Sequence, residues 1–120
     1  MSTIFSNIPE DKWISSNELS FAILDIYPAS DGHTLVIPKR EIETFFELSD
    51  GELIAIKQLI VSRKEEISLN DPTVEGFNIF INNGKVAGQT VFHLHFHLIP
   101  RRKGDNAWEN YFQNLRRAKN

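Results

Sequence analysis

The stretch Val91-Phe92-His93-Leu94-His95-Phe96-His97-Leu98-Ile99 alternates histidine with large apolar residues and holds three of the chain's four histidines. Successive side chains of a β-strand point to opposite faces. The pattern therefore predicts a strand over 91–99 whose imidazoles share one face while its apolar side chains enter a core. Imidazole can act as nucleophile, base or acid near neutral pH, because its unperturbed pKa is about 6.5. The stretch predicts a core strand and a reactive site together.

Upstream apolar runs predict the rest of a sheet. The runs 21–26 and 33–37 are each followed by a proline, and the sequence Ala-Ser-Asp-Gly at 29–32 predicts a tight turn between two antiparallel strands. A third strand is predicted over 76–82. We expect it to neighbour the histidine strand, because only the glycine-bearing loop 83–90 separates the two.

Two helices are predicted outside these strands. Ser49 and Glu52 have the spacing of a capping box, and the helix they begin should end by Pro72. Its apolar face is expected to comprise Leu53, Ile56, Ile60 and Ile67. A C-terminal amphipathic helix, capped by Asp105, is predicted from Trp108, Tyr111, Phe112 and Leu115, whose role we expect to be packing. Together the elements predict an α+β fold, an antiparallel meander sheet with one long central helix and a C-terminal helix, in a single domain over 1–120.

Composition narrows the classes of function. The formal net charge of −3 gives no overall basic field for nucleic acid or anionic lipid, so we expect neither as a partner. The absence of cysteine excludes disulfides and thiol chemistry. No window approaches the roughly 18 apolar residues of a membrane span, and the N-terminus does not resemble a signal peptide, so we expect a cytoplasmic protein. Five basic residues are expected to be solvated surface charges: Lys39, Arg40, Arg101, Arg102 and Lys103.

Two other interpretations of the histidines remain open at this point. One is a solvent-facing polar stripe on an amphipathic strand. The other is a three-histidine zinc site, with His33 able to contribute from the hairpin. Residues two apart on one strand face are about 7 Å apart, so three in a row converge poorly on one ion, and we expect neither a metal nor a cofactor.

Two further features carry weaker signals. The glycines of the loop that precedes the histidines allow backbone N–H groups to approach an anion closely, although the same sequence also suits an ordinary turn. Asp25 suits a turn and a ligand contact equally, because its carboxylate can accept hydrogen bonds from a ribose diol.

The segment 89–99, Gln-Thr-Val-Phe-His-Leu-His-Phe-His-Leu-Ile, resembles the signature of the histidine triad (HIT) superfamily of nucleotide hydrolases and transferases. The segments 24–28 and 32–39 resemble that family's first hairpin, so the likeness covers about 21–104. It implies the HIT fold, a nucleotide substrate and a homodimer whose sheets join across the two-fold axis, with the aromatic residues of the C-terminal helix as further contacts.

The resemblance also implies roles for particular residues. The family's nucleophile corresponds to His95, with His93, His97 and the hairpin residue His33 as its histidine neighbours. Asp25 and Ile26 correspond to the ribose and base side, and Asn82, Gly88, Gln89 and Thr90 to the surroundings of the phosphate and leaving group. Backbone amides from Gly88 onward, together with His97, are expected to stabilise the phosphoryl oxygens, and Gln89 or Thr90 to contact the bridging oxygen.

Two departures narrow the choice of branch. The cysteine pair that binds structural zinc in some members is missing, and His97 disfavours the hexose-phosphate uridylyltransferases, which carry glutamine there. The segments 87–91 and 98–105 look more like bacterial members of the diadenosine-polyphosphate hydrolase branch than like nucleoside phosphoramidases. We therefore expect hydrolysis of dinucleoside polyphosphates at the α-phosphate through a nucleotidyl-histidine intermediate. The alternatives are a phosphoramidase, a non-catalytic nucleotide-binding module and, last, a metal-dependent hydrolase.

Overall fold

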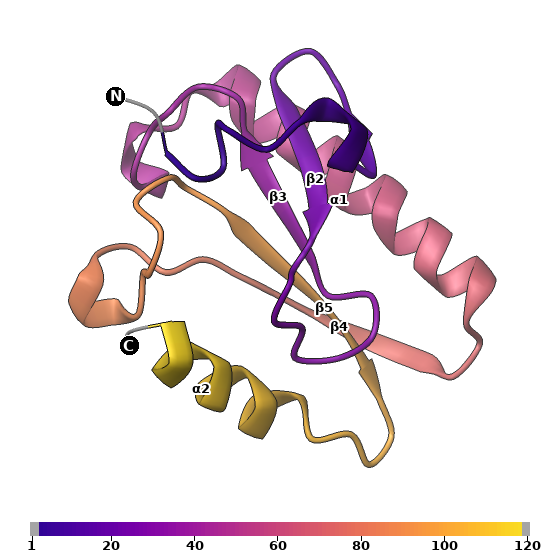
Figure 1. Ribbon diagram of the computed structural model, residues 1–120. Helices are drawn as coiled ribbons and strands as arrows, with labels where there is room; N and C mark the ends of the chain where they lie inside the picture. Colours follow the sequence, from indigo (N-terminus) through magenta and orange to yellow (C-terminus); the bar gives the residue numbers. More distant parts are fainter. Residues whose placement is uncertain (1–2, 119–120) are drawn as a thin grey trace.

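The computed structural model describes residues 3–118, and the chain ends 1–2 and 119–120 of the predicted domain lie outside them (Figure 1). The described elements are, in order, the 3-10 turn η1 (Glu10–Lys12), β1 (Ser15–Ser16), β2 (Ser20–Leu24), β3 (Thr34–Pro38), η2 (Phe45–Glu47), α1 (Asp50–Asn70), β4 (Val74–Phe80), η3 (Lys85–Ala87), β5 (Phe96–Arg102) and α2 (Ala107–Ala118). This arrangement confirms the predicted α+β class with a long central helix and a C-terminal helix. No helix within 3–118 is both long and apolar enough to cross a membrane.

The strands form one antiparallel sheet in the order β1-β2-β3-β5-β4 among the residues described. The predicted hairpin is the β2–β3 pair, which the bond from Asp25 N–H to the His33 carbonyl extends by one step. Its connection turns at Ser30–His33, where Gly32 has a φ of 93° that favours glycine. The predicted pairing of the third strand with the histidine strand is confirmed by β4–β5, although β4 begins and ends two residues earlier than predicted.

Helix α1 begins at the predicted capping box and ends before Pro72. The Ser49 side chain accepts a hydrogen bond from Glu52 N–H, and the Glu52 carboxylate accepts one from Ser49 N–H. The helix covers one face of the sheet, where its side chains meet residues of β2, β3 and β5 in a core of Ala22, Val36, Ile42, Ile56, Leu59, Leu94 and Phe96. The predicted apolar face of α1 was wrong at Leu53, which is 40% exposed. The buried face of the helix includes Ala55 and Leu59 instead.

The opposite face of the sheet is covered by two segments far apart in sequence. The segment before β1 brings Phe5 onto Phe21, Ile23, Leu35 and Ile37. Helix α2 packs Ala107 and Tyr111 onto Ile99 of β5, and Asp105 accepts a hydrogen bond from Ala107 N–H, so its predicted capping role is confirmed. Trp108 and Phe112 remain 37% and 53% exposed.

The histidine stretch is not a strand along its whole length, which corrects the prediction for 91–99. Strand β5 starts only at Phe96, and its register with β3 runs from Thr34–Leu98 to Val36–Phe96. Continuing the same register would bring Pro38 into the ladder, and proline has no N–H to donate. The preceding residues instead follow an irregular course, in which Leu94 N–H donates to the Ile42 carbonyl.

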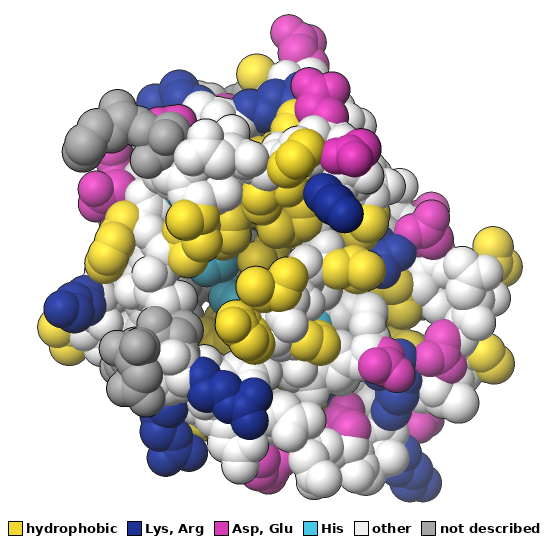
Figure 2. Space-filling model, in the orientation of Figure 1, with side chains coloured by type: hydrophobic (Ala, Val, Ile, Leu, Met, Phe, Trp, Pro, Cys, Tyr) yellow, Lys and Arg dark blue, Asp and Glu magenta, His cyan; other side chains and the backbone are white. Residues whose placement is uncertain are grey.

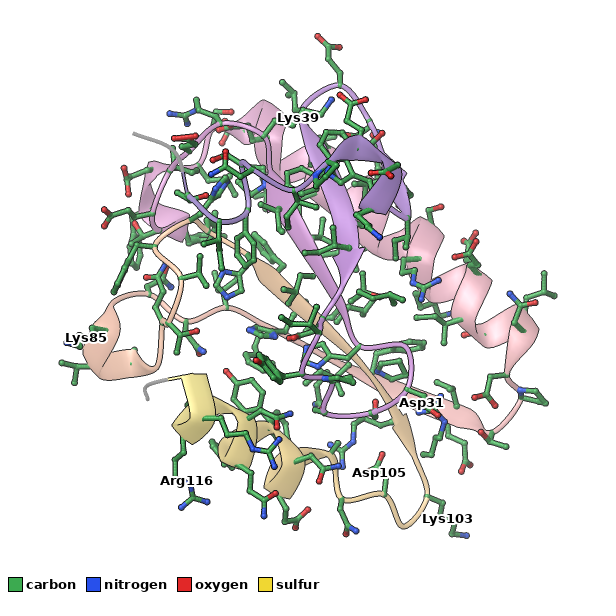
Figure 3. The ribbon with its side chains drawn as sticks, in the orientation of Figure 1. Asp31, Lys39, Lys85, Lys103, Asp105 and Arg116 are labelled. Carbon is green, nitrogen blue, oxygen red and sulfur yellow. The ribbon has the colours of Figure 1, made fainter. Side chains whose placement is uncertain are left out.

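Most of the basic residues expected on the surface are held there by carboxylates. Arg40 pairs with Glu52, Arg101 with Asp105 and Arg102 with Asp71. Lys39 and Lys103 lie at the periphery of the molecule (Figure 3).

Replacing Ser49 by alanine should lower the free energy of unfolding by about 1 kcal/mol, because the first turn of α1 loses its side-chain acceptor. Denaturant unfolding measures the change. Ser62→Ala, at an exposed position of the same helix, is the matched control and should be neutral. Equal stabilities of the two variants would contradict the assignment of Ser49 as the cap.

Candidate functional site

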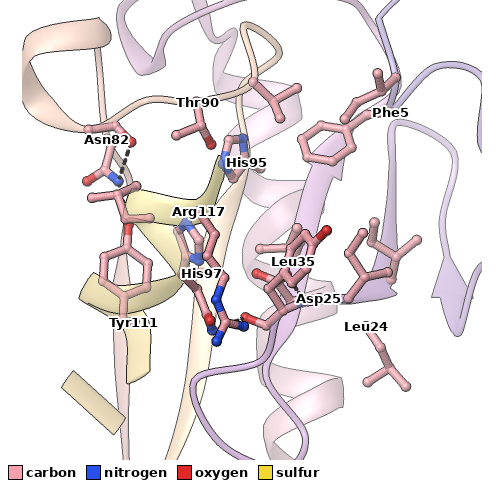
Figure 4. A pocket seen from close by; sticks show the side chains of 18 of the residues that line it. Phe5, Leu24, Asp25, Leu35, Asn82, Thr90, His95, His97, Tyr111 and Arg117 are labelled. Atoms are coloured by element: carbon pink, nitrogen blue, oxygen red, sulfur yellow. Dashed lines mark hydrogen bonds between the residues drawn. The ribbon is translucent and has the colours of Figure 1, made fainter. Parts of the chain in front are cut away.

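A pocket of about 650 Å³ opens on the face of the sheet opposite α1, between the N-terminal segment and α2. Figure 2 shows imidazole surface at the bottom of a hollow that is ringed by hydrophobic side chains. The pocket brings together seven of the residues predicted from the sequence: Asp25, Ile26, Asn82, Gly88, Thr90, His95 and His97 (Figure 4). Three others, His33, His93 and Gln89, lie behind its wall and are buried.

The imidazole of His95 is held with one nitrogen available to the pocket. Its Nδ1 lies 2.8 Å from the backbone carbonyl oxygen of His93. A carbonyl can only accept, so Nδ1 carries the hydrogen and Nε2 of the neutral ring keeps its lone pair. Burial is the main cause that lowers the pKa of His95, opposed by the hydrogen bond to His93. The ring is therefore neutral near pH 7, which is the form that can attack phosphorus.

A chain of hydrogen bonds fixes the tautomer of His97. Ala29 N–H donates to His33 Nδ1 at 3.0 Å, so neutral His33 carries its hydrogen on Nε2, which lies 2.9 Å from His97 Nδ1. His97 then carries its own hydrogen on Nε2. Burial is the main cause that lowers the pKa of His33 to about 4, and the positive charge of a protonated His95 is the second cause. Burial is also the main cause that lowers the pKa of His97 to about 2. His97 thus offers the pocket an N–H donor.

His93 supports the site from behind. Its Nε2 donates to the Pro38 carbonyl at 2.8 Å, and its Nδ1 lies 2.7 Å from the Thr3 hydroxyl. The Phe5 ring packs edge-on against both His93 and His95, at centroid distances of 5.9 and 5.1 Å. These contacts hold the peptide whose carbonyl receives the hydrogen of His95.

Asp25 takes part in the turn that its sequence allowed, and it also lies at the pocket. One carboxylate oxygen accepts the Tyr27 N–H at 2.9 Å, which forms a turn, and the side chain also lines the pocket. The other oxygen lies 3.5 Å from His33 Nε2, and because His33 is neutral this contact is not an ion pair. Burial raises the pKa of Asp25, while the Tyr27 hydrogen bond lowers it.

The loop before the histidines differs from the expected cradle of amides. The N–H groups of Gly88 and Gln89 donate within the loop, to the carbonyls of Lys85 and Gly84. The Gln89 side chain donates to the Glu43 and Val91 carbonyls and accepts from Gly84 N–H. Gln89 therefore shapes the loop, and the hydroxyl of Thr90 is the loop's side-chain donor in the pocket.

The walls of the pocket come largely from residues that sequence reasoning did not assign to the site. The N-terminal segment contributes Ile4, Phe5 and Ile8, and α2 contributes Tyr111, Asn114, Leu115 and Arg117. The spacing of Tyr111 and Leu115 placed them on one helix face, but the neighbouring sequence did not indicate which part of the protein that face covers. Among the described lining residues, Arg117 is the only one with a permanent positive charge.

The histidines do not form the metal site considered from the sequence. Among residues 3–118, the group whose ligand atoms come within 4.8 Å of one another is Asp25, His33 and His97, without His93 and His95. The Nε2 of His33 carries a hydrogen because Ala29 N–H occupies Nδ1, so an ion there would have to displace that hydrogen. The geometry instead suits a hydrogen-bond relay.

The HIT domain family model matches residues 7–104. The chain is 45% identical over 95 residues to an uncharacterised HIT-like protein of Methanocaldococcus jannaschii, covering 78% of this chain and 71% of that one. It is 41% identical over 88 residues to the adenosine 5′-monophosphoramidase hnt1 of Schizosaccharomyces pombe, covering 73% and 62%. A crystal structure of a HIT family member from Bacillus subtilis superposes with a TM-score of 0.78 at 30% identity, covering 99% and 95%. The chain belongs to the HIT family.

The buried neutral imidazoles predict how stability depends on pH. The pKa values of His33 and His97 are lowered in the folded protein, so below pH 6.5 the unfolded chain binds more protons. Protonation of His33 and of His97 on unfolding should each lower the free energy of unfolding by up to about 1.4 kcal/mol for every pH unit below 6.5. Denaturant unfolding at pH 7.5 and 5.5 measures the loss.

The variant His33→Gln is the matched comparison, because glutamine can still donate to His97 Nδ1 but does not titrate. Its stability should fall less steeply between the two pH values. A pH dependence as steep as that of the wild type would contradict the role assigned to His33.

Proposed function

We propose that this protein hydrolyses dinucleoside polyphosphates at the α-phosphate through a nucleotidyl-His95 intermediate and releases a nucleoside monophosphate. The observation that carries the proposal is the bond from His95 Nδ1–H to the His93 carbonyl, which leaves Nε2 as a free nucleophile at the floor of the pocket. Membership of a family whose relatives include named nucleotide-cleaving enzymes supports it.

The chemistry divides into two displacements. His95 Nε2 attacks the α-phosphorus, an N–P bond forms, and the bridging P–O bond breaks with its electron pair leaving on the polyphosphate. The imidazole becomes positively charged while its Nδ1–H stays on the His93 carbonyl, which stabilises that charge. Water then attacks phosphorus, returns the electron pair to Nε2 and loses its proton to solvent.

Two donors in the pocket suit the phosphoryl oxygens. His97 presents Nε2–H because its Nδ1 accepts from His33, and Thr90 presents a hydroxyl. Donors of this kind are commonly worth about 3 to 4 kcal/mol each in comparable oxyanion sites. They replace the Gly88 and Gln89 amides, whose hydrogens are used inside the loop.

The nucleoside end fits the other side of the pocket. Asp25 offers a carboxylate to the ribose hydroxyls, and apolar residues of the N-terminal segment, with Ile26 at the rim, offer a surface to the base. Arg117 adds a positive charge suited to an anionic substrate.

A second candidate reaction is the cleavage of purine nucleoside phosphoramidates. The names of two relatives favour it, the monophosphoramidases of Schizosaccharomyces pombe and Candida albicans, while an Arabidopsis thaliana relative is named adenylylsulfatase. All three reactions need the same nucleophile and differ in the leaving group. A non-catalytic nucleotide-binding module would use the same pocket without forming an adduct.

Replacing His95 by alanine should abolish turnover and leave AMP affinity within about threefold, because only the attacking nitrogen is lost. Intact-mass spectrometry after rapid quench with diadenosine tetraphosphate, and separately with an adenosine phosphoramidate, should show an adenylyl adduct in the wild type and none in the variant. The faster substrate decides between the branches. AMP binding without an adduct or AMP release in the wild type would favour the binding module, and activity that chelators remove and zinc restores would favour a metal-dependent hydrolase.

Replacing Asp25 by alanine should raise KM about 5- to 30-fold with a smaller effect on kcat, because a contact to the ribose acts on binding. Asp31→Ala removes an exposed carboxylate from the same connection and is the matched control (Figure 3). A loss confined to kcat would contradict the ribose assignment.

We also propose that the protein is a homodimer. Strand β4 lies at the edge of the sheet, and the exposed rings of Trp108 and Phe112 provide apolar contact area. Sedimentation velocity should show a dimer at micromolar concentration, and a stable monomer would refute the proposal.

A further inference from the structure

The hydroxyl group of Tyr111 stands in the pocket with its hydrogen uncommitted. The side chain is 91% buried, lines the pocket, and its oxygen accepts a hydrogen bond from Asn82 Nδ2 at 2.7 Å. Among the described residues no acceptor for the Tyr111 O–H is found. A buried hydroxyl donor beside a pocket is normally satisfied by water or by a ligand.

The direction of the Asn82–Tyr111 bond follows from a third group. The same Nδ2 atom lies 3.4 Å from the Gly88 carbonyl oxygen. If the amide were turned over, its oxygen would face that carbonyl, and two acceptors would oppose each other. Asn82 therefore donates to Tyr111, and the phenol hydrogen points elsewhere.

The position of the phenol ring is fixed by its neighbours. It packs edge-on against His97 at 5.4 Å and against Phe80 at 5.2 Å between centroids. Figure 4 shows Tyr111 and Asn82 on one side of His95 and His97, with Phe5, Leu24 and Asp25 on the other. The hydroxyl thus lies at the end of the pocket away from the nucleoside side. Burial, with the charge of Asp25, raises the pKa of Tyr111, so the phenol keeps its hydrogen.

We infer that Tyr111 is a further catalytic residue, which donates a hydrogen bond to the leaving-group oxygen as the bond between that oxygen and the α-phosphorus breaks. This inference rests on the proposed function, since it needs His95 as the attacking group. Negative charge collects on the departing oxygen when it takes the electron pair of the P–O bond. The phenol stabilises this charge by a hydrogen bond and transfers no proton, so no further reactant is needed.

The test compares Tyr111→Phe with wild type on two matched substrates, the phenyl and p-nitrophenyl esters of AMP. Phenylalanine keeps the ring contacts and removes only the hydroxyl. A phenolate leaving group holds its charge on oxygen, whereas p-nitrophenolate spreads it over the ring and depends less on a donor. We expect kcat/KM to fall about 10- to 100-fold on the phenyl ester, the usual worth of a hydrogen bond to a charged group, and less than about threefold on the p-nitrophenyl ester.

Phe112→Leu is the control for disturbance of α2, because Phe112 is half-exposed on the same helix and does not line the pocket. It should leave the ratio of the two rates unchanged. Thermal unfolding of all three proteins checks that the variants fold.

An equal loss on both esters would assign Tyr111 a structural role and overturn the inference, as would the absence of any loss. The adenylyl adduct separates this result from failure of the proposed function. An adduct in the wild type that is missing in His95→Ala supports the proposed function whatever Tyr111→Phe shows. No adduct from diadenosine tetraphosphate or from either ester in the wild type would overturn both.

Discussion

The end of the β3–β5 ladder at Val36–Phe96, two residues before Pro38, is the constraint on which the site depends. Because proline cannot donate, the histidine stretch leaves the sheet before β5, and backbone groups that would have paired with a neighbouring strand become partners of side chains. The Pro38 carbonyl receives the hydrogen of His93, and the His93 carbonyl receives that of His95. A regular strand through 91–95 would have used such carbonyls in the ladder and left the imidazoles without fixed hydrogens.

Neutrality of the His33, His95 and His97 imidazoles follows from the same arrangement. Each ring has a defined donor nitrogen, and in His33 and His97 the acceptor nitrogen is occupied as well, by Ala29 N–H and by His33 Nε2–H. A proton added to either ring would place two donors against each other in a region from which water is excluded. The site is thus built for uncharged imidazole, and protonation of these rings at low pH should destabilise the fold.

Sequence reasoning recovered what short-range patterns encode. Apolar runs joined by a turn sequence identified the hairpin, alternation identified the core half of the histidine stretch, and the Ser49 capping box located the start of α1. The irregular backbone course at His93 was not predicted from the sequence, because that course depends on Pro38, a residue distant in sequence. The role of Gln89 in shaping the loop was not predicted for the same reason, since its side-chain amide donates to the carbonyl of Glu43, which is also distant in sequence. Tyr111 was interpreted correctly as a packing residue, but helical spacing does not reveal that its hydroxyl reaches a pocket that His95 and His97 also line.

The pocket combines a floor on the sheet with two covers from the ends of the described chain. Its floor lies inside the segment 7–104 that the family shares, while Thr3, Phe5 and the whole of α2 lie outside it. The walls take no part in the hydrogen bonding of the sheet, so their side chains can change in sequence while the ladder stays intact, except where Thr3 and Phe5 hold His93 and His95. A scaffold of this kind lets the two covers change the shape and polarity of the pocket while the sheet beneath them keeps its architecture.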